Sequence, residues 1–183
     1  MVGVATLTHP VLGPEEFAAA MERAGWRAPM ELIDGEVVVI PPSGGDASLA
    51  QTEIVHRLRT WQDGQPTGGR VLTDVFVRVG DGYLAPDAAW WAPGHEPTIR
   101  PGALDTIPDL VIEVLSPATR DNDLGAKRTR YLTAGVRELW LIDPGDRSVT
   151  VIDARGERRL TADADLRSPL LPGFSASVDA LFA

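Results

Sequence analysis

The most apolar strand-length segment of the chain, residues 110–115, carries a carboxylate, Glu113, near its middle. A continuous apolar run rich in β-branched residues is typical of a strand that is buried on both faces. An unpaired ionised carboxylate there would cost several kcal/mol, which is comparable with the whole stability of a small domain. The pattern therefore predicts a partner for Glu113, either a basic side chain or another cation such as a metal ion.

Periodicity and turn residues predict the other elements of the chain. Asp34-Gly35 is a strong hairpin signal, because glycine accepts the positive φ that a two-residue turn requires. Ser48 and Gln51 resemble the capping box that opens a helix. The expected elements are, in order, a helix over 14–24, strands over 30–33 and 36–40, a helix from Ser48 to about Trp61, strands over 71–79 and 83–91, a loop over 92–108, the strand over 110–115, a helix from about Asp123 to Ala134, and strands over 138–143 and 148–152.

The order of these elements predicts the fold class. Strand, helix and strand over residues 110–143 favour a parallel crossover, whereas the short turns on either side favour antiparallel hairpins. We therefore expect an α/β (α+β) fold with a mixed β-sheet flanked by helices. The length fits a single domain, 1–183, and no repeat, low-complexity tract or linker divides it. Its parts would be an N-terminal helix over 14–24, a core over about 31–145 and C-terminal strands within 147–183.

The composition excludes several kinds of site. The chain has no cysteine, which rules out disulfides, thiolate zinc sites and cysteine nucleophiles. Its three histidines, His9, His56 and His95, lack the spacing of a zinc site. No segment has the pattern of a signal peptide or the length of a membrane span, so we expect a cytoplasmic protein with no membrane partner.

Charge is distributed unevenly along the chain. The net charge of −9 argues against avid, non-specific binding of nucleic acid. Basic residues nevertheless gather in the C-terminal half, where they predict either a solvated helix face or a surface that faces a polyanion. They are Arg120, Lys127, Arg128, Arg130, Arg137, Arg147, Arg155, Arg158 and Arg159.

Two carboxylates and a lysine follow one another in an order that suits metal-assisted hydrolysis. Asp87 ends a predicted strand, Glu113 lies on the apolar strand, and Lys127 lies on the next predicted helix, beside a face formed by Leu124, Arg128 and Tyr131. Mg²⁺ prefers carboxylates and water as ligands, and it acidifies a bound water that can attack phosphorus. A lysine can orient that water or stabilise the negative charge that develops on the phosphate. The three residues therefore predict a site for phosphodiester hydrolysis.

These residues and their surroundings also carry a resemblance. The chain resembles the Uma-type endonucleases of the PD-(D/E)XK, or restriction-endonuclease-like, superfamily. The matching segments are Glu31-Leu32-Ile33-Asp34-Gly35-Glu36, Pro86-Asp87, residues 108–117 (PDLVIEVLSP), Asp123 through Lys127 to Tyr131, and Gly135-Val136 through to Trp140-Leu141-Ile142-Asp143-Pro144. They span most of the chain from residue 31 to about 145, and the 108–144 block is quite specific. The resemblance implies a restriction-endonuclease-like core, with a mixed sheet of four or more strands flanked by helices.

The resemblance implies a function and the residues that perform it. Asp87 and Glu113 would bind Mg²⁺, with Mn²⁺ as a substitute, Glu31 would be an additional acidic residue, and Lys127 would be the catalytic lysine. The superfamily usually places its lysine two residues after the acid, where this chain has a leucine. The Uma-type pattern moves the lysine to the next helix, which favours Lys127, with Arg128 as the alternative. The implied activity is that of a metal-dependent endonuclease that hydrolyses DNA phosphodiester bonds, and the superfamily adds the expectation of a homodimer.

The same residues leave further interpretations open. A catalytically silent module with a nuclease fold could bind nucleic acid or a protein partner. An assembly domain could instead pair Glu113 with Arg128 or Arg137. Glu36 competes with Glu31 for the assisting role, across the same turn.

The sequence also predicts roles for four residues that are not among the four proposed site residues. Asp109 shares the strand face of Glu113 and is a weaker ligand candidate. Asp123 is expected to cap the helix that follows it. Trp90 and Trp91 alternate faces of their strand, which leaves one of them exposed for stacking on bases.

Overall fold

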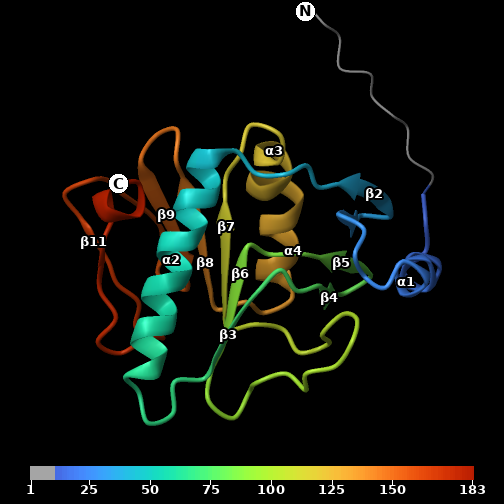
Figure 1. Ribbon diagram of the computed structural model, residues 1–183, viewed down its shortest axis with the longest axis horizontal. Helices are drawn as coiled ribbons and strands as arrows, with labels where there is room; N and C mark the ends of the chain where they lie inside the picture. Colours follow the sequence, from blue (N-terminus) through green and yellow to red (C-terminus); the bar gives the residue numbers. More distant parts are fainter. Residues whose placement is uncertain (1–10) are drawn as a thin grey trace, which may run out of the picture.

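Residues 11–183 are described by the computed structural model, and they form β-sheets with helices packed against them (Figure 1). His9 lies outside the described residues. The helices are α1 (Pro14–Arg23), α2 (Gly45–Asp63), α3 (Arg120–Asn122), the π-helical turn η1 (Asp123–Lys127), α4 (Arg128–Thr133) and the 3₁₀ turn η2 (Asp179–Leu181). The strands are β1 (Met30–Ile33), β2 (Glu36–Val39), β3 (Arg70–Thr73), β4 (Val77–Val79), β5 (Gly82–Leu84), β6 (Ala88–Trp91), β7 (Leu110–Val114), β8 (Glu138–Asp143), β9 (Ser148–Asp153), β10 (Gly156–Leu160), β11 (Asp165–Leu166) and β12 (Ala176–Ser177). Among residues 11–183, no helix combines the length and the apolar character that crossing a bilayer demands.

Two sheets hold most of the strands. The larger sheet has six strands in the order β10-β9-β8-β7-β6-β3, and the smaller has four in the order β2-β1-β5-β4. β7 and β8 are parallel, and the other neighbours in both sheets are antiparallel. The connection from β7 to β8 runs through α3, η1 and α4, as predicted for residues 110–143. The predicted mixed sheet flanked by helices is therefore confirmed.

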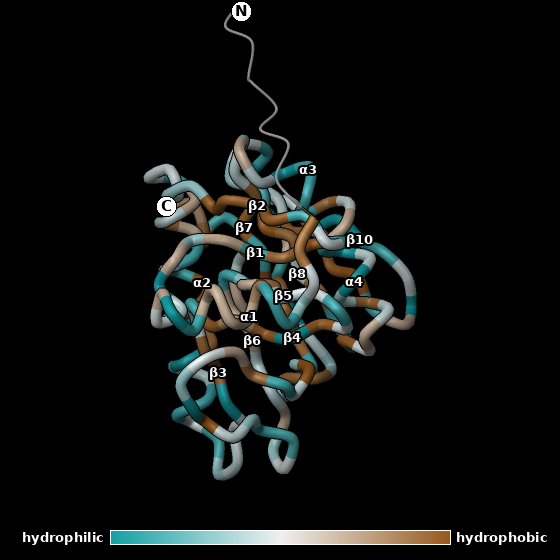
Figure 2. The backbone as a smooth tube through the Cα atoms, turned by 90° about the vertical axis from the view of Figure 1, so that its right-hand side faces the viewer, coloured by the Kyte–Doolittle hydropathy of each residue, from teal (hydrophilic) through white to brown (hydrophobic). Residues whose placement is uncertain are grey.

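The larger sheet separates two apolar cores. On one face, α2 and the C-terminal segment with β11, β12 and η2 pack against the strands, and α2 crosses in front of this sheet in Figure 1. On the other face, α4 and the smaller sheet pack against the same strands. α1 covers the far side of the smaller sheet. Figure 2 shows hydrophobic segments along the inner strands and hydrophilic segments in the surrounding loops.

Side-chain alternation along β7 decides which way its carboxylate points. Leu110, Ile112 and Val114 belong to the core beneath α2, whereas Val111 belongs to the core beneath α4. Because successive side chains of a strand point to opposite faces, Glu113 points to the α4 side with Val111. Glu113 is only 2% exposed, so the expected buried carboxylate is present.

Two predicted strands are each divided between the two sheets. The predicted strand over 71–79 becomes β3 in the larger sheet and β4 in the smaller one, because Asp74 has a φ of 52°, which an extended strand cannot adopt. The predicted strand over 83–91 likewise becomes β5 and β6. Pro86 lies in that break, since proline has no N–H for a central ladder. The chain therefore passes between the sheets immediately before Asp87.

α2 begins before its predicted capping box. Gly44 is the N-cap residue, and Ser48 lies inside the helix, where its carbonyl accepts a hydrogen bond of 2.8 Å from the hydroxyl of Thr52. The predicted cap at Ser48 was wrong, because Asp46 already supplies a negative charge to the first turn.

Both tryptophans of β6 are buried. Trp90 is 2% exposed and Trp91 is 0% exposed. Their indole N–H groups donate to the carbonyls of Gly68 and Thr106, at 2.8 and 2.9 Å. Because β6 has an apolar core on each face, alternation buries both rings, and the expectation of one exposed ring was wrong.

The close approach of Gly69 to β6 predicts a large cost for a methyl group there. A Cβ at Gly69 would lie 2.1 Å from the carbonyl oxygen of Trp91, and the residue has a φ of +69°. Gly94 has a φ of +82°, but a Cβ there would meet no atom within 4 Å. In urea denaturation we expect Gly69→Ala to lower the free energy of unfolding by about 1–3 kcal/mol more than Gly94→Ala, the usual cost of overpacking. Equal losses would show that the positive φ alone sets the cost.

Candidate active site

A buried ammonium group lies among carboxylates from three parts of the chain. It belongs to Lys127 at the end of η1, the only lysine in the sequence. Its Nζ lies 2.8 Å from Oε1 of Glu113, 3.0 Å from Oε1 of Glu31 and 3.2 Å from Oδ1 of Asp123. All four side chains are at most 5% exposed. Lys127 is therefore the basic partner that the burial of Glu113 requires.

Two of these carboxylates come from strands of different sheets. Glu113 lies on β7, and its Oε1 accepts a hydrogen bond of 2.8 Å from the hydroxyl of Tyr131. Glu31 lies on β1, and its Oε1 accepts a hydrogen bond of 2.7 Å from the N–H of Ala85. Because β1 belongs to the smaller sheet and β7 to the larger one, Lys127 joins the two sheets at this point.

The helical segment after β7 carries polar groups into the interior. Asp123, Lys127 and Tyr131 are spaced four residues apart, so they lie on one side of the segment. η1 is a π-helical turn between two α-helical pieces, and such turns are frequent at functional sites. Leu124 is exposed and Arg128 is half-exposed. The predicted face of Leu124, Arg128 and Tyr131 was therefore wrong for its first two members, because the wider π turn rotates Lys127 inward.

Asp87 stands opposite Glu113 on the neighbouring strand. β6 and β7 pair Ala88 with Ile112, and one further step of this antiparallel register sets Asp87 against Glu113. Oδ2 of Asp87 accepts a hydrogen bond of 2.6 Å from the N–H of Val114. Asp87 is partly exposed, whereas the other carboxylates around Lys127 are buried. The site therefore reaches solvent on the Asp87 side.

An excess of negative charge characterises the resulting acid–lysine cluster, which consists of Glu31, Asp87, Glu113, Asp123 and Lys127. Burial raises the pKa of Asp87 to about 6 and raises the pKa of Glu113 well above its usual range, and nearby carboxylates add to both effects. Burial lowers the pKa of Lys127, but the surrounding acidic groups, Glu113 first among them, together outweigh burial and hold that pKa well above its usual value. With four carboxylates and one ammonium group, the cluster attracts protons or any other cation.

Two carboxylate oxygens of the acid–lysine cluster have no protein partner within residues 11–183. Within residues 11–183, the contacts of Glu113 fall on Oε1 and the hydrogen bond of Asp87 falls on Oδ2. Oε2 of Glu113 and Oδ1 of Asp87 are thus left for another partner. In the same residues, no three His, Cys, Asp or Glu side chains form a ready-made metal site. Mg²⁺ keeps several waters and needs few protein ligands, so two carboxylates within an uncompensated negative charge fit it.

The structure brings together the four residues predicted for the site, Asp87, Glu113, Lys127 and Glu31. It leaves out the competing acid, because Glu36 is exposed on β2. The roles of the four residues stay predictions, but their proximity is a feature of the fold.

The two arginines considered as partners of Glu113 lie outside the cluster. Arg128 pairs with Glu157 at 2.8 Å, and Arg137 pairs with Asp109 at 3.2 Å. Neither arginine is therefore the partner of Glu113, and Arg128 does not take the place predicted for the lysine.

Asp109 also has no part in the cluster. It precedes β7, at the opposite end of the strand from Glu113. There it accepts a hydrogen bond of 2.8 Å from the N–H of Ala92 and contacts His95 at 2.9 Å. These contacts hold the loop after β6 to the start of β7, which is a structural role.

Sequence reasoning missed three contributors to the cluster. Asp123 was expected to cap a helix, but it makes no capping hydrogen bond and lies buried against Lys127. Tyr131 was assigned only to a helix face. Gln51 was assigned to a capping box, but its side-chain amide donates to the carbonyl of Asp87 at 3.1 Å. The four-residue spacing of Asp123, Lys127 and Tyr131 was the one signal that could have revealed the first two.

Arginines of the C-terminal half are paired with carboxylates. The ion pairs of these arginines within the described residues include Arg120–Asp143, Arg128–Glu157, Arg130–Asp34, Arg130–Asp81, Arg137–Asp109, Arg147–Asp179, Arg155–Asp153, Arg158–Asp153, Arg159–Asp146 and Arg167–Asp165. This pairing neutralises much of the positive charge locally. It favours a salt-bridged, solvated surface over one that faces a polyanion.

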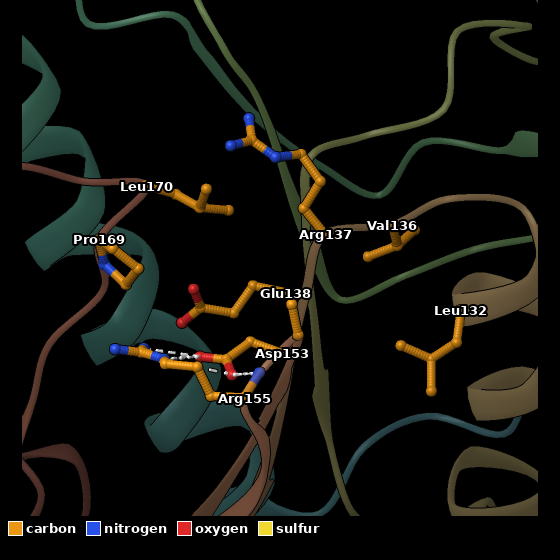
Figure 3. Close-up of a pocket in the computed structure, with 9 residues that line it drawn as sticks. Leu132, Val136, Arg137, Glu138, Asp153, Arg155, Pro169 and Leu170 are labelled. Atoms are coloured by element: carbon orange, nitrogen blue, oxygen red, sulfur yellow. Dashed lines mark hydrogen bonds and ion pairs between the residues drawn. The ribbon is translucent and has the colours of Figure 1, made fainter.

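A separate hollow of about 510 Å³ lies at the beginning of β8, at the opposite end of the parallel strand pair from Glu113 (Figure 3). Its carboxylates already have partners. Glu138 accepts hydrogen bonds from Trp140 and Ser168, at 2.7 and 2.8 Å, and Asp153 pairs with Arg155 at 2.7 Å. No member of the acid–lysine cluster lines this hollow. The residues that the sequence predicts for the site therefore lie in the cluster and not in this hollow.

The mixed sheet and its flanking helices form a restriction-endonuclease-like fold. A similar solved structure is described as a "putative nuclease belonging to DUF820 from Anabaena variabilis ATCC 29413". The two structures have a TM-score of 0.79 and 23% sequence identity, over 93% of this chain and 97% of that one. At this identity the similarity shows the fold.

The sequence itself identifies the family. The profile of the Uma2 family, described as "Putative restriction endonuclease", matches residues 14–179. The chain belongs to the Uma2 family, and the resemblance seen in its motifs is confirmed. Among curated proteins, none matches this chain.

The raised pKa of Asp87 predicts how stability depends on pH in EDTA-containing buffer. The folded protein binds a proton at Asp87 with a pKa of about 6, against an ordinary value of 3.8. Since the folded state holds more protons at Asp87 between these two values, the contribution of Asp87 to the free energy of unfolding falls as the pH rises from about 4 to about 6, and above that pH it is constant. A shift of about two units corresponds to about 3 kcal/mol.

Asp87→Asn should remove this contribution, because asparagine still accepts from Val114 but cannot ionise. The variant should match the wild type near pH 4 and exceed its stability at pH 8 by up to about 3 kcal/mol. Urea denaturation across this range measures the difference, with the exposed Asp163→Asn as the control. A difference that does not change with pH would contradict the assignment.

Proposed function

We propose that the protein is a Mg²⁺-dependent endonuclease that hydrolyses phosphodiester bonds in DNA. The observation that carries the proposal is the pair of facing carboxylates, Asp87 and Glu113, beside the buried Lys127. Each carboxylate has one oxygen without a protein partner within residues 11–183. Membership of the Uma2 family and the nuclease fold support the proposal.

Asp87 and Glu113 would hold the metal ion through their free oxygens. When bound, Mg²⁺ or Mn²⁺ supplies an acidified water for attack on phosphorus and neutralises the charge that builds on the phosphate. The N–H of Val114 orients Asp87, and the hydroxyl of Tyr131 orients Glu113. Hydrogen bonds of this kind hold ligands in position, so both carboxylates are oriented before a metal ion arrives.

Lys127 would place a positive charge beside the reacting phosphate. Its ammonium group can orient the attacking water or donate to the phosphate oxygen on which negative charge develops. Because the pKa of Lys127 is raised, the group stays ionised at neutral pH. Glu31 assists by holding the ammonium group at 3.0 Å, while the N–H of Ala85 fixes Glu31 itself.

A catalytically silent module with the same fold is the second candidate. The net charge of −9 and the pairing of the exposed arginines favour it, since both weaken the attraction of a polyanion. The acid–lysine cluster counts against it. Buried carboxylates cost stability, and a module without catalysis has no use for three of them, with Asp87 beside them, around one lysine.

Cleavage is expected to require both a divalent metal ion and Glu113. The purified protein should cleave supercoiled plasmid or single-stranded DNA with Mg²⁺ or Mn²⁺, and it should not do so with EDTA. Glu113→Gln should abolish cleavage, because it removes a metal-binding carboxylate. Glu138→Gln should retain it, because Glu138 is equally buried but lies outside the cluster. Gel electrophoresis of timed reactions makes the comparison.

Thermal unfolding in the same buffers distinguishes the two candidate functions. Mg²⁺ at about 100 times its Kd should stabilise the wild type by about 2.7 kcal/mol. Glu113→Gln should gain almost nothing. Stabilisation of the wild type without cleavage of either DNA would favour the silent module. If Glu113→Gln cleaved as fast as the wild type, the metal assignment would fail.

The charge of Lys127 can be tested by chemical rescue, because the chain has no cysteine and Lys127→Cys introduces a unique thiol. We expect this variant to lose about 10²- to 10³-fold in kcat, the usual effect of removing one group that stabilises developing charge. Alkylation with 2-bromoethylamine in denaturant, followed by refolding, restores an ammonium group of nearly the original length and should restore cleavage. Alkylation with iodoacetamide adds a neutral group and is the control. Equal recovery with both reagents would contradict a role for the charge.

A further inference from the structure

Asp123 has a buried oxygen atom whose hydrogen-bonding capacity is unused. Its Oδ1 is inaccessible to solvent and has no hydrogen bond within residues 11–183. Nζ of Lys127 lies 3.2 Å away, so the two groups form an ion pair, but the contact lacks hydrogen-bond geometry. A buried acceptor without a donor is costly and uncommon in native proteins. Its retention therefore requires a physical explanation.

The ammonium group of Lys127 lies closer to two oxygens that already have donors. Oε1 of Glu113 accepts from the hydroxyl of Tyr131 at 2.8 Å, and Oε1 of Glu31 accepts from the N–H of Ala85 at 2.7 Å. Lys127 lies 2.8 and 3.0 Å from these two oxygens. A small movement of the ammonium group would give a second arrangement, in which Lys127 donates to Oδ1 of Asp123, the oxygen that lacks a donor.

A divalent cation at Asp87 and Glu113 would favour that second arrangement. Like charges repel strongly where water is excluded, so an ammonium group is driven away from a carboxylate that binds a dication. The hydroxyl of Tyr131 continues to hold Glu113 in place. Asp123 and Lys127 are one helical turn apart, so the backbone keeps this pair adjacent whatever the other carboxylates do.

We propose that Asp123 is a positioning residue for Lys127: when Glu113 turns to a divalent cation, the ammonium group leaves Glu113 and donates to Oδ1 of Asp123. This inference rests on the proposed metal-dependent function. Asp123 contacts neither the metal ion nor the DNA, and it acts by holding the ammonium group of the lysine beside the reacting phosphate. The unused oxygen is then the one that receives the lysine in the metal-bound state.

The single lysine allows the partner change to be observed directly by NMR. Protein labelled with ¹⁵N in lysine alone gives one side-chain Nζ signal. For the wild type, this signal should move to a new position as Mg²⁺ replaces EDTA and saturates the site. For Asp123→Asn, it should broaden at saturation, because an ammonium group that keeps only Glu31 as an anionic partner exchanges protons with water faster than one held by both carboxylates. Arg128→Gln, on α4 and outside the cluster, should behave like the wild type.

Metal affinity and cleavage rate separate positioning from metal binding. By calorimetry, Asp123→Asn should bind Mg²⁺ with a Kd close to that of the wild type, because Asp123 is not a ligand. Its kcat should fall by about 10- to 100-fold with little change in KM for DNA, a loss typical of residues that act through a neighbouring group. A residue that only stabilised the fold would lower the melting temperature and leave the Nζ signal of the folded protein unchanged.

Three results would overturn the inference. If Mg²⁺ binds the wild type and the Nζ signal does not move, the lysine does not change partner. If Asp123→Asn abolishes Mg²⁺ binding, Asp123 is itself a ligand. If the wild type binds neither Mg²⁺ nor Mn²⁺, the proposed function fails together with the inference, which distinguishes this case from the first two. Should Asp123→Asn fail to fold, the titration of the wild type decides alone.

Discussion

The pairing of one buried ammonium group with several buried carboxylates is the interaction on which this structure depends. β7 is the most apolar strand-length segment of the chain, and it can carry Glu113 only because Lys127 lies 2.8 Å away. The same lysine also contacts Glu31 and Asp123, so one positive charge serves several negative ones. The positive charge of Lys127 therefore neutralises only part of the negative charge around it. A more stable protein would replace these groups with apolar side chains, and the proposed binding of a divalent cation gives a reason for the excess of negative charge.

The path of the chain between the two sheets explains how the cluster is assembled. Glu31 comes from the smaller sheet, Glu113 from the larger one, and Lys127 from the crossover that follows. Asp87 lies where the chain leaves β5 and enters β6, immediately after Pro86. An uninterrupted strand would have carried this segment along one sheet. The break delivers Asp87 to the beginning of β6, an inner strand of the larger sheet, opposite Glu113, with its side chain on the partly exposed side of the cluster.

Much of the fold could be predicted from the sequence, because several elements have strong local signals. The apolar runs of β7 and β8, the Asp34-Gly35 turn and the crossover helix each depend on nearby residues alone. The division of the strand over 71–79 depends on the positive φ of Asp74, which no local pattern announces. In the site, Asp87, Glu113, Lys127 and Glu31 were found by chemistry and by resemblance. Asp123 was misassigned, because a local capping rule was applied to a residue whose contacts are set by tertiary packing.

The scarcity of lysine has a consequence for how this molecule responds to proteases. The only lysine of the chain is buried at the end of η1, so a lysine-specific protease finds no exposed cleavage site in the folded residues 11–183. In the unfolded chain it would cut once, after Lys127, and separate β7 from its parallel neighbour β8. Two fragments would then appear only from molecules in which η1 has opened and Lys127 has left Glu31 and Glu113. The residue that joins the two sheets in the native state is thus also an internal reporter of their separation.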